Sequence, residues 1–124
     1  MKKLLLVLLA FALVSCINQT INRESTFLIS HTFDDVWRAS IRAVNDIGFT
    51  VDSLDIKAGF IGAASGTHVG QAVPPRLSIF ITELRGRVFV DCKVLQKEQF
   101  IDVFGHGKRT IRRFMIALNM NLNS

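Results

Sequence analysis

The chain has 124 residues, 49% of them hydrophobic, and its 15 Lys and Arg outnumber its 10 Asp and Glu, for a net charge of +5 at pH 7. A chain of this length can build one domain with a modest core, and two domains would not fit. The sequence contains no internal repeat, low-complexity tract or acidic run, which excludes a repeat architecture.

The first fifteen residues have the three parts of a secretory signal peptide. Lys2 and Lys3 give a positive start, residues 4–14 are almost unbroken in apolar character, and residues 13–16 (Leu-Val-Ser-Cys) close the segment. The eleven apolar residues would form only about 16 Å of helix, roughly half of the hydrocarbon core of a bilayer. We therefore expect a cleaved signal rather than a transmembrane helix.

The tetrapeptide at residues 13–16 resembles the lipobox of bacterial lipoproteins. That resemblance implies cleavage just before Cys16, a diacylglycerol on its sulfur and usually an acyl chain on the new amino group. Residue 17 is Ile rather than the Asp that tends to retain such proteins in the inner membrane, so the resemblance implies the periplasmic face of the outer membrane. An ordinary cleaved signal, which would give a free soluble protein, is the alternative.

Cleavage before Cys16 would leave residues 16–124, a chain of 109 residues. Without Lys2 and Lys3, 13 basic side chains face 10 acidic ones, for a net charge of +3. This weak charge, together with export, argues against nucleic acid as a partner. Residues 17–25 are polar and lack periodicity, so we expect a tether that spans at most about 30 Å and keeps the domain and its partners close to the membrane.

Cys92 would have no disulfide partner if the sulfur of Cys16 carries lipid. It alternates with Val88, Val90 and Val94 in an apolar row. This pattern predicts a small buried hydrophobic residue rather than a reactive thiol, which would need an electropositive and partly exposed site.

The predicted domain, residues 26–124, begins with a short strand over residues 26–30 and then a helix. Thr32 with Asp35 three residues later is typical of a helix N-terminus, and Gly48 is typical of a helix C-terminus. Apolar residues recur between them at helical spacing, which places Trp37 in the core.

Four further strands are predicted at residues 49–54, 60–64, 76–84 and 87–95. The first two form a hairpin around a turn at 55–59, and the last two form a hairpin around Arg85 and Gly86. A loop rich in Gly and Pro, residues 65–75, joins the hairpins. The face of the second hairpin that we expect to point at the helices consists of Leu77, Ile79, Ile81, Val88, Val90, Cys92 and Val94.

A second helix follows Gly105 and Gly107. Its apolar stripe is formed by Ile111, Phe114, Met115, Leu118 and Leu122. The resulting order is β-α-β-β-β-β-α. An antiparallel sheet with both helices on one face buries all of these stripes at once, so the sequence predicts a single α+β domain.

Three motifs resemble the helix-grip domains of BamC (NlpB)-type lipoproteins. They are residues 32–37 (Thr-Phe-Asp-Asp-Val-Trp), 47–51 (Ile-Gly-Phe-Thr-Val) and 55–61 (Asp-Ile-Lys-Ala-Gly-Phe-Ile). The resemblance implies a helix-grip-like sheet and an outer-membrane accessory lipoprotein without known catalysis. This chain has one such domain where the family prototype has two, and it has no counterpart of the prototype's long extended arm.

Residues suited to catalysis or metal binding are scattered. His31, His68 and His106 lie far apart, and no H-x-x-H or C-x-x-C spacing is present. No G-x-S-x-G motif occurs, and residues 62–66 lack the strand-to-helix context of a nucleophile elbow. We therefore expect neither a cofactor or metal site nor an enzyme.

Four cations, Lys108, Arg109, Arg112 and Arg113, stand in the first turns of the last predicted helix. Cations at a helix N-terminus oppose the helix dipole by some tenths of a kcal/mol each. They form either a solvated helix face that pairs with nearby carboxylates or a contact surface for lipid phosphates or an acidic partner.

The function we expect is that of a membrane-anchored, non-catalytic module that docks on another envelope protein, with an accessory role in outer-membrane assembly. The alternative is a lipoprotein that binds a small hydrophobic ligand beneath its helix. An apolar cavity over roughly 300 Å³ would favour the ligand binder, whereas a filled core with an exposed apolar patch would favour docking.

Overall fold

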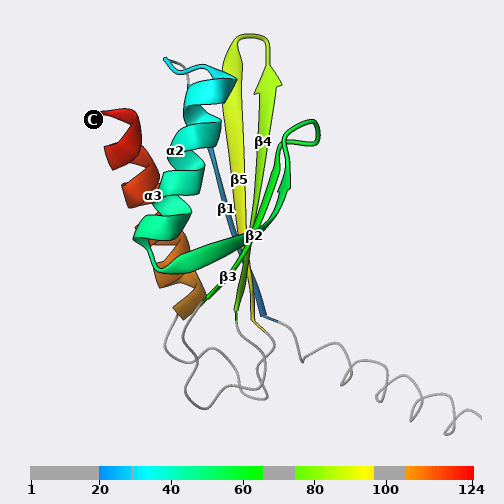
Figure 1. Ribbon diagram of the computed structural model, residues 1–124, viewed down its shortest axis with the longest axis vertical. Coiled ribbons are helices and arrows are strands. Elements are labelled where there is room, and N and C mark those ends of the chain that lie inside the picture. Colours follow the sequence, from blue (N-terminus) through cyan, green and yellow to red (C-terminus); the bar gives the residue numbers. More distant parts are fainter. Residues whose placement is uncertain (1–19, 29, 66–74, 97–105) are drawn as a thin grey trace, which may run out of the picture.

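A computed structural model describes residues 20–28, 30–65, 75–96 and 106–124 of the chain. These residues form one domain of two layers, a sheet of strands with alternating apolar residues and a pair of helices with apolar stripes. The elements are β1 (Thr20–Leu28), α2 (Phe33–Asp46), β2 (Phe49–Asp55), β3 (Phe60–Ser65), β4 (Arg76–Leu84), β5 (Arg87–Gln96) and α3 (His106–Leu122). The strands form one antiparallel sheet in the order β1-β5-β4-β3-β2. Both helices pack side by side on one face of this sheet, as predicted (Figure 1).

The predicted start of the domain is wrong by six residues. Residues 20–25, which we expected to be tether, continue β1 and pair with β5 from Thr20 opposite Gln96 to Leu28 opposite Val88. Strand β1 lies at the edge of the sheet and is held there by backbone hydrogen bonds to β5. This pairing does not require apolar side chains on the solvated face of the strand. Only residues 17–19 therefore separate Cys16 from the sheet.

Helix α2 begins and ends where its sequence signals predict. The Thr32 hydroxyl accepts a hydrogen bond from the Asp35 backbone N–H at 3.2 Å, and Asp34 and Asp35 complement the positive end of the helix dipole. Gly48 follows the helix with a φ of +87°, a left-handed conformation that glycine adopts most readily. Trp37 is 8% exposed and its ring stacks on Phe33 with centroids 6.0 Å apart, so its predicted place in the core is confirmed.

The core lies between the helices and the inner face of the sheet. The seven residues predicted to form the inner face of the β4–β5 hairpin are all buried. From α3, Ile111, Phe114 and Leu118 are buried against them, while Met115 and Leu122 pack at the margin. The predicted α+β fold is confirmed.

Two turns connect the strands of the two hairpins. Arg85 and Gly86 join β4 to β5 with φ angles of +52° and +75°, the geometry of a tight type I′ connection. The β2–β3 turn carries Gly59, whose carbonyl accepts a hydrogen bond from the Ile81 N–H at 2.7 Å. This bond ties the turn to β4.

Candidate functional site

No metal-binding cluster occurs within the part of the chain that the structure describes. A group of three or more His, Cys, Asp or Glu side chains suited to an ion is absent there. His31 precedes α2 and is partly buried, His106 opens α3, and His68 lies outside the described residues. None of the described helices is long and apolar enough to cross a membrane.

Cys92 is buried in the sheet, as the sequence predicts. Burial raises the pKa of its thiol far above the ordinary value, and the negative charges of Asp91 and Glu24 raise it further. The thiol is therefore protonated at neutral pH and unsuited to nucleophilic chemistry. Cys16, the predicted lipidation site, lies outside the described residues.

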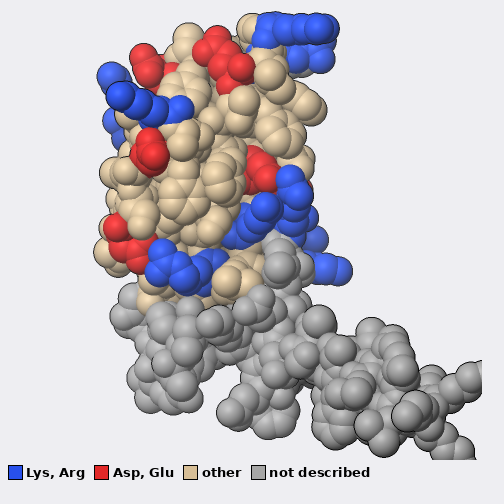
Figure 2. Space-filling model, turned by 90° about the vertical axis from the view of Figure 1, so that its right-hand side faces the viewer, with Lys and Arg blue, Asp and Glu red and all other residues tan. Residues whose placement is uncertain are grey.

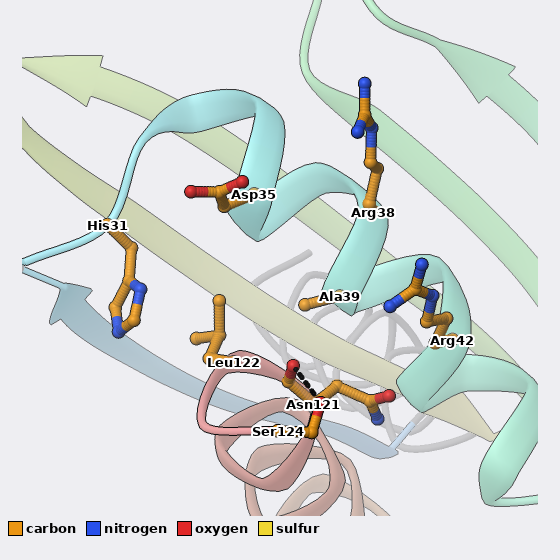
Figure 3. A pocket seen from close by; sticks show the side chains of 8 residues that line it. All are labelled: His31, Asp35, Arg38, Ala39, Arg42, Asn121, Leu122 and Ser124. Atoms are coloured by element: carbon orange, nitrogen blue, oxygen red, sulfur yellow. Dashed lines mark hydrogen bonds between the residues drawn. The ribbon is translucent and has the colours of Figure 1, made fainter.

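A surface hollow of about 300 Å³ lies between α2 and the C-terminal end of α3 (Figure 3). Its lining residues are His31, Asp35, Arg38, Ala39, Arg42, Asn121, Leu122 and Ser124. The charged groups are of both signs, and Arg38 points away from α3 (Figure 3). The Asn121 amide is already engaged, because it donates to the Asp46 carboxylate at 2.9 Å and to the Ala117 carbonyl at 2.8 Å. This hollow lacks the apolar lining that a hydrophobic ligand needs.

A second hollow, of about 180 Å³, opens between β1 and α3. Its lining residues are Glu24, Thr26, Leu28, Met115, Leu118, Asn119 and Leu122. It is more apolar than the first but smaller than the roughly 300–1,000 Å³ typical of sites for small molecules.

The open face of the sheet, which is the face turned away from both helices, carries a row of four phenylalanines. Phe80 and Phe89 alternate with buried residues of β4 and β5, so they point to the opposite face. Phe27 is paired with Phe89, and Phe60 with Phe80, which places them on the same face. We call Phe27, Phe89, Phe80 and Phe60 the aromatic row; it crosses four adjacent strands.

The rings of the aromatic row contact one another in pairs. The centroids of Phe27 and Phe89 are 4.9 Å apart, and those of Phe60 and Phe80 are 5.0 Å apart. Phe80 and Phe89 are diagonal neighbours on β4 and β5, a spacing that aromatic rings can bridge. Phe27 is nevertheless 56% exposed and Phe80 39% exposed, so the row remains accessible to a partner.

Charged residues surround the aromatic row. The Arg23 guanidinium pairs with Asp91 at 2.7 Å, and Arg76 pairs with Asp52 at 2.7 Å. The Lys93 ammonium lies 5.8 Å from the centre of the Phe80 ring. Figure 2 shows this side of the molecule with uncharged atoms at its centre and charged atoms toward its margins. The pattern of an apolar centre with a charged rim is that of many protein interfaces.

The basic cluster, Lys108, Arg109, Arg112 and Arg113, lies on the first turns of α3, and all four residues are exposed. The ion pairs found among the described residues involve Arg23 and Arg76 and none of these four. The structure thus brings the four predicted cations together on one helix surface. It does not provide the carboxylate partners of the alternative interpretation within the described residues.

The fold of this chain is similar to those of solved structures. A crystal structure of an uncharacterized protein from Bacillus thuringiensis superposes with a TM-score of 0.61 at 8% identity, over 85% of this chain and 100% of that one. The crystal structure of Ara h 8.0201 superposes with a TM-score of 0.61 at 9% identity, over 86% of this chain and 99% of that one. The chain has a helix-grip fold. No protein-family model and no curated protein matches the sequence.

In this helix-grip domain the aromatic row is the feature that sequence reasoning missed. Alternation in β4 and β5 predicts the buried face and leaves the composition of the opposite face unexplained. Phe80 lies between Ile79 and Ile81, and Phe89 between Val88 and Val90. Large aromatic residues at the outward positions of two adjacent strands were the available signal, because a solvated face usually carries polar residues there.

Proposed function

We propose that the protein is a non-catalytic lipoprotein that is anchored to the periplasmic face of the outer membrane through Cys16 and docks on another envelope protein. The docking surface is the open face of its sheet. The observation that carries this proposal is the aromatic row, which no described element covers.

The distribution of apolar surface favours docking over ligand binding. The space between helices and sheet holds buried apolar side chains from both layers, including Trp37, Ile79 and Phe114. The four aromatic side chains, by contrast, lie outside this core on the opposite face. Exposed apolar patches that are rimmed by polar groups mark interaction sites, and Phe is enriched in the centres of interfaces.

The charges on the open face indicate the chemistry of the partner. Arg23 and Arg76 are engaged by carboxylates of the chain itself, whereas Lys93 reaches over Phe80 and Arg87 is exposed on the same face. The cations left for a partner therefore adjoin the aromatic row. The partner we propose presents an apolar patch flanked by carboxylates, because opposite charges at the rim guide and orient association.

Two features support the proposed membrane anchor: the signal peptide-like residues 1–16 and the position at which the sheet begins. The lipobox-like residues 13–16 provide the acylation signal, and the strand that begins at Thr20 leaves a tether of three residues. Two or three acyl chains give stable anchoring where a single chain does not. The proposal of a partner that takes part in outer-membrane assembly rests only on the resemblance of residues 32–37, 47–51 and 55–61 to BamC-type lipoproteins.

The apolar hollow between β1 and α3 is the observation that favours the alternative function. A slender hydrophobic ligand could lie against Leu28 and Met115 there. Its volume of about 180 Å³ accommodates only part of such a molecule, so this function ranks second.

Photocrosslinking in intact cells tests the docking proposal. A photoreactive phenylalanine analogue replaces Phe80 in the full-length chain, and in a matched control it replaces Met120, an exposed apolar residue of α3. We expect a discrete crosslinked product with a different protein from position 80 and none from position 120. Lys93→Glu should weaken that product, whereas Arg42→Glu on α2 should leave it unchanged.

Three outcomes would contradict the docking proposal. They are equal products from both positions, no product from position 80, and a product whose mass equals two copies of this chain, since the last would make the open face a surface for self-association.

A further inference from the structure

The basic cluster occupies one side of α3. Successive residues of an α-helix are rotated by about 100°, so Lys108, Arg109, Arg112 and Arg113 fall within an arc of about 140°. Ile111 and Phe114, buried against the sheet, point to the other side of the helix. The four cations therefore form a continuous outward surface two turns long.

An anion from outside the described residues would stabilise this surface. Positive charges in the first turns of a helix are repelled by the positive end of its dipole. No carboxylate of the described residues forms an ion pair with any of the four, since the described ion pairs are those of Arg23 and Arg76. A negatively charged surface in contact with the cluster would remove this unfavourable term.

The topology places the cluster at the end of the domain from which the chain leads to Cys16. Thr20 opens β1 and is paired with Gln96, the last residue of β5, so the end of β5 and the start of β1 lie at one end of the sheet. The later residues of β1 and α3, such as Leu28 and Leu122, line one hollow, so the two elements run in the same direction. The start of α3 therefore lies near the start of β1, as Figure 1 shows.

We propose that the basic cluster binds anionic lipid headgroups of the membrane that carries the acylated Cys16, and that this contact sets the orientation of the domain. The inference rests on the anchoring part of the proposed function and not on docking through the open face. The four residue-to-residue steps from Cys16 to Thr20 span at most about 14 Å. Long Lys and Arg side chains at the same end can then enter the layer in which surface charge is unscreened, about 8 Å deep at physiological ionic strength.

The orientation has a consequence for docking. With the start of α3 against the membrane, the turn at Arg85 and Gly86 points away from it, because β4 rises from Arg76 near the anchored end to Leu84 at the far end. The open face then stands roughly upright beside the membrane. Its aromatic row faces sideways, toward neighbouring envelope proteins, rather than toward lipid.

Binding to vesicles of defined composition tests the proposal. Residues 17–124 contain every described helix and strand, so this unlipidated chain isolates the electrostatic contact from the acyl chains. The cluster variant carries Arg109→Gln, Arg112→Gln and Arg113→Gln. The matched control carries Arg38→Gln, Arg85→Gln and Arg87→Gln, which removes the same charge from exposed positions elsewhere. Equal melting temperatures would establish that both variants are folded.

We expect the wild-type chain to bind phosphatidylcholine vesicles that contain phosphatidylglycerol, to ignore pure phosphatidylcholine, and to bind more weakly as salt rises. The cluster variant should bind at least about tenfold more weakly, since each cation near an anionic surface contributes measurably to affinity. The control variant should bind as the wild type does. An equal loss of vesicle affinity in the two variants would mean that binding depends only on the net charge of the chain, and it would overturn the proposal. Absence of wild-type binding would also overturn it and would favour an acidic protein as the partner of the cluster.

The docking proposal is tested separately by crosslinking from position 80 in the acylated chain. Failure of vesicle binding with retained crosslinking would remove the orienting contact alone. Failure of crosslinking with retained vesicle binding would remove the docking surface alone.

Discussion

Arg23 on β1 holds Asp91 on β5 through two hydrogen bonds, from Nε to Oδ1 at 2.8 Å and from Nη2 to Oδ2 at 2.7 Å. The Asp91 side chain is only 7% exposed, although it lies on the open face of the sheet. The guanidinium therefore covers a carboxylate that the surrounding residues have removed from water, and the contact raises the pKa of Arg23.

We predict that Arg23→Gln destabilises the domain more than Arg76→Gln does. The first change removes both hydrogen bonds to the Asp91 carboxylate, which is only 7% exposed, and the loss of a partner costs more for a buried charged group than for an exposed one. The second breaks a pair whose side chains are both more than 40% exposed, and such surface pairs contribute little. Urea unfolding measures the free energy of unfolding of both variants. An equal decrease in the two would contradict the interpretation that Asp91 is a buried carboxylate and Asp52 an exposed one.

The pH dependence of the Arg76 pair supplies a control. The hydrogen bond from Arg76 lowers the pKa of Asp52. A group with a lowered pKa stabilises the fold above its unfolded pKa of about 3.9, and this stabilisation is lost as pH falls through the lowered value. The small difference between wild type and Arg76→Gln should therefore vanish in acid. A difference that persists at the lowest pH at which the domain is folded would indicate a packing effect.

We predict that Trp37→Ala destabilises the domain by about 3–5 kcal/mol, the usual range for emptying a large buried aromatic site. Ile116→Ala on the exposed side of α3 should change stability by less than about 0.5 kcal/mol. Because Trp37 is the one tryptophan of the chain, fluorescence reports its environment directly. Water-like emission that iodide quenches freely in the folded wild type would show that the residue is not in the core.

The elements that the sequence predicts correctly are those that bury side chains in a regular pattern. The inner face of β4 and β5 and the stripe of α2 were predictable, because every second or every third to fourth residue must be apolar to be buried. Residues Thr20–Ser25 were not, because an edge strand can be held by its backbone hydrogen bonds alone.

Part of the aromatic row also could not be predicted, because it depends on how β1 pairs with β5. The contact of Phe27 with Phe89 depends on the register between β1 and β5, which the sequence does not specify. The position of the basic cluster within α3 was predictable from the sequence. Its nearness to the anchored end was not, since it depends on the direction of α3 relative to β1.

We predict that Gly59→Ala is much more destabilising than Gly86→Ala. Both glycines have positive φ angles, of +71° and +75°, so both substitutions strain the backbone. A Cβ at Gly59 would also lie 2.0 Å from the Ile81 carbonyl oxygen, whereas nothing lies within 4 Å of a Cβ at Gly86. Thermal unfolding of the two variants measures the contribution of the close approach, and similar melting temperatures would show that β4 can shift to accommodate a methyl group.

We predict that Cys16→Ser abolishes lipid modification and blocks maturation, because no other residue provides a thiol at the cleavage junction. Metabolic labelling with palmitate measures acylation, and Cys92→Ser serves as the control that should keep the label. Label retained by the Cys16→Ser variant would place the anchor elsewhere or exclude it.

Thiol accessibility in native membranes tests docking through the open face most directly. Phe80→Cys places a thiol in the aromatic row, and Met120→Cys places one on α3, while the buried Cys92 with its raised pKa gives little background. We predict that a maleimide reagent labels position 80 several-fold more slowly in native membranes than in the detergent-purified lipoprotein, and labels position 120 at the same rate in both. Equal rates at position 80 in the two preparations would show that the open face is uncovered in the envelope and would contradict its role as the docking surface.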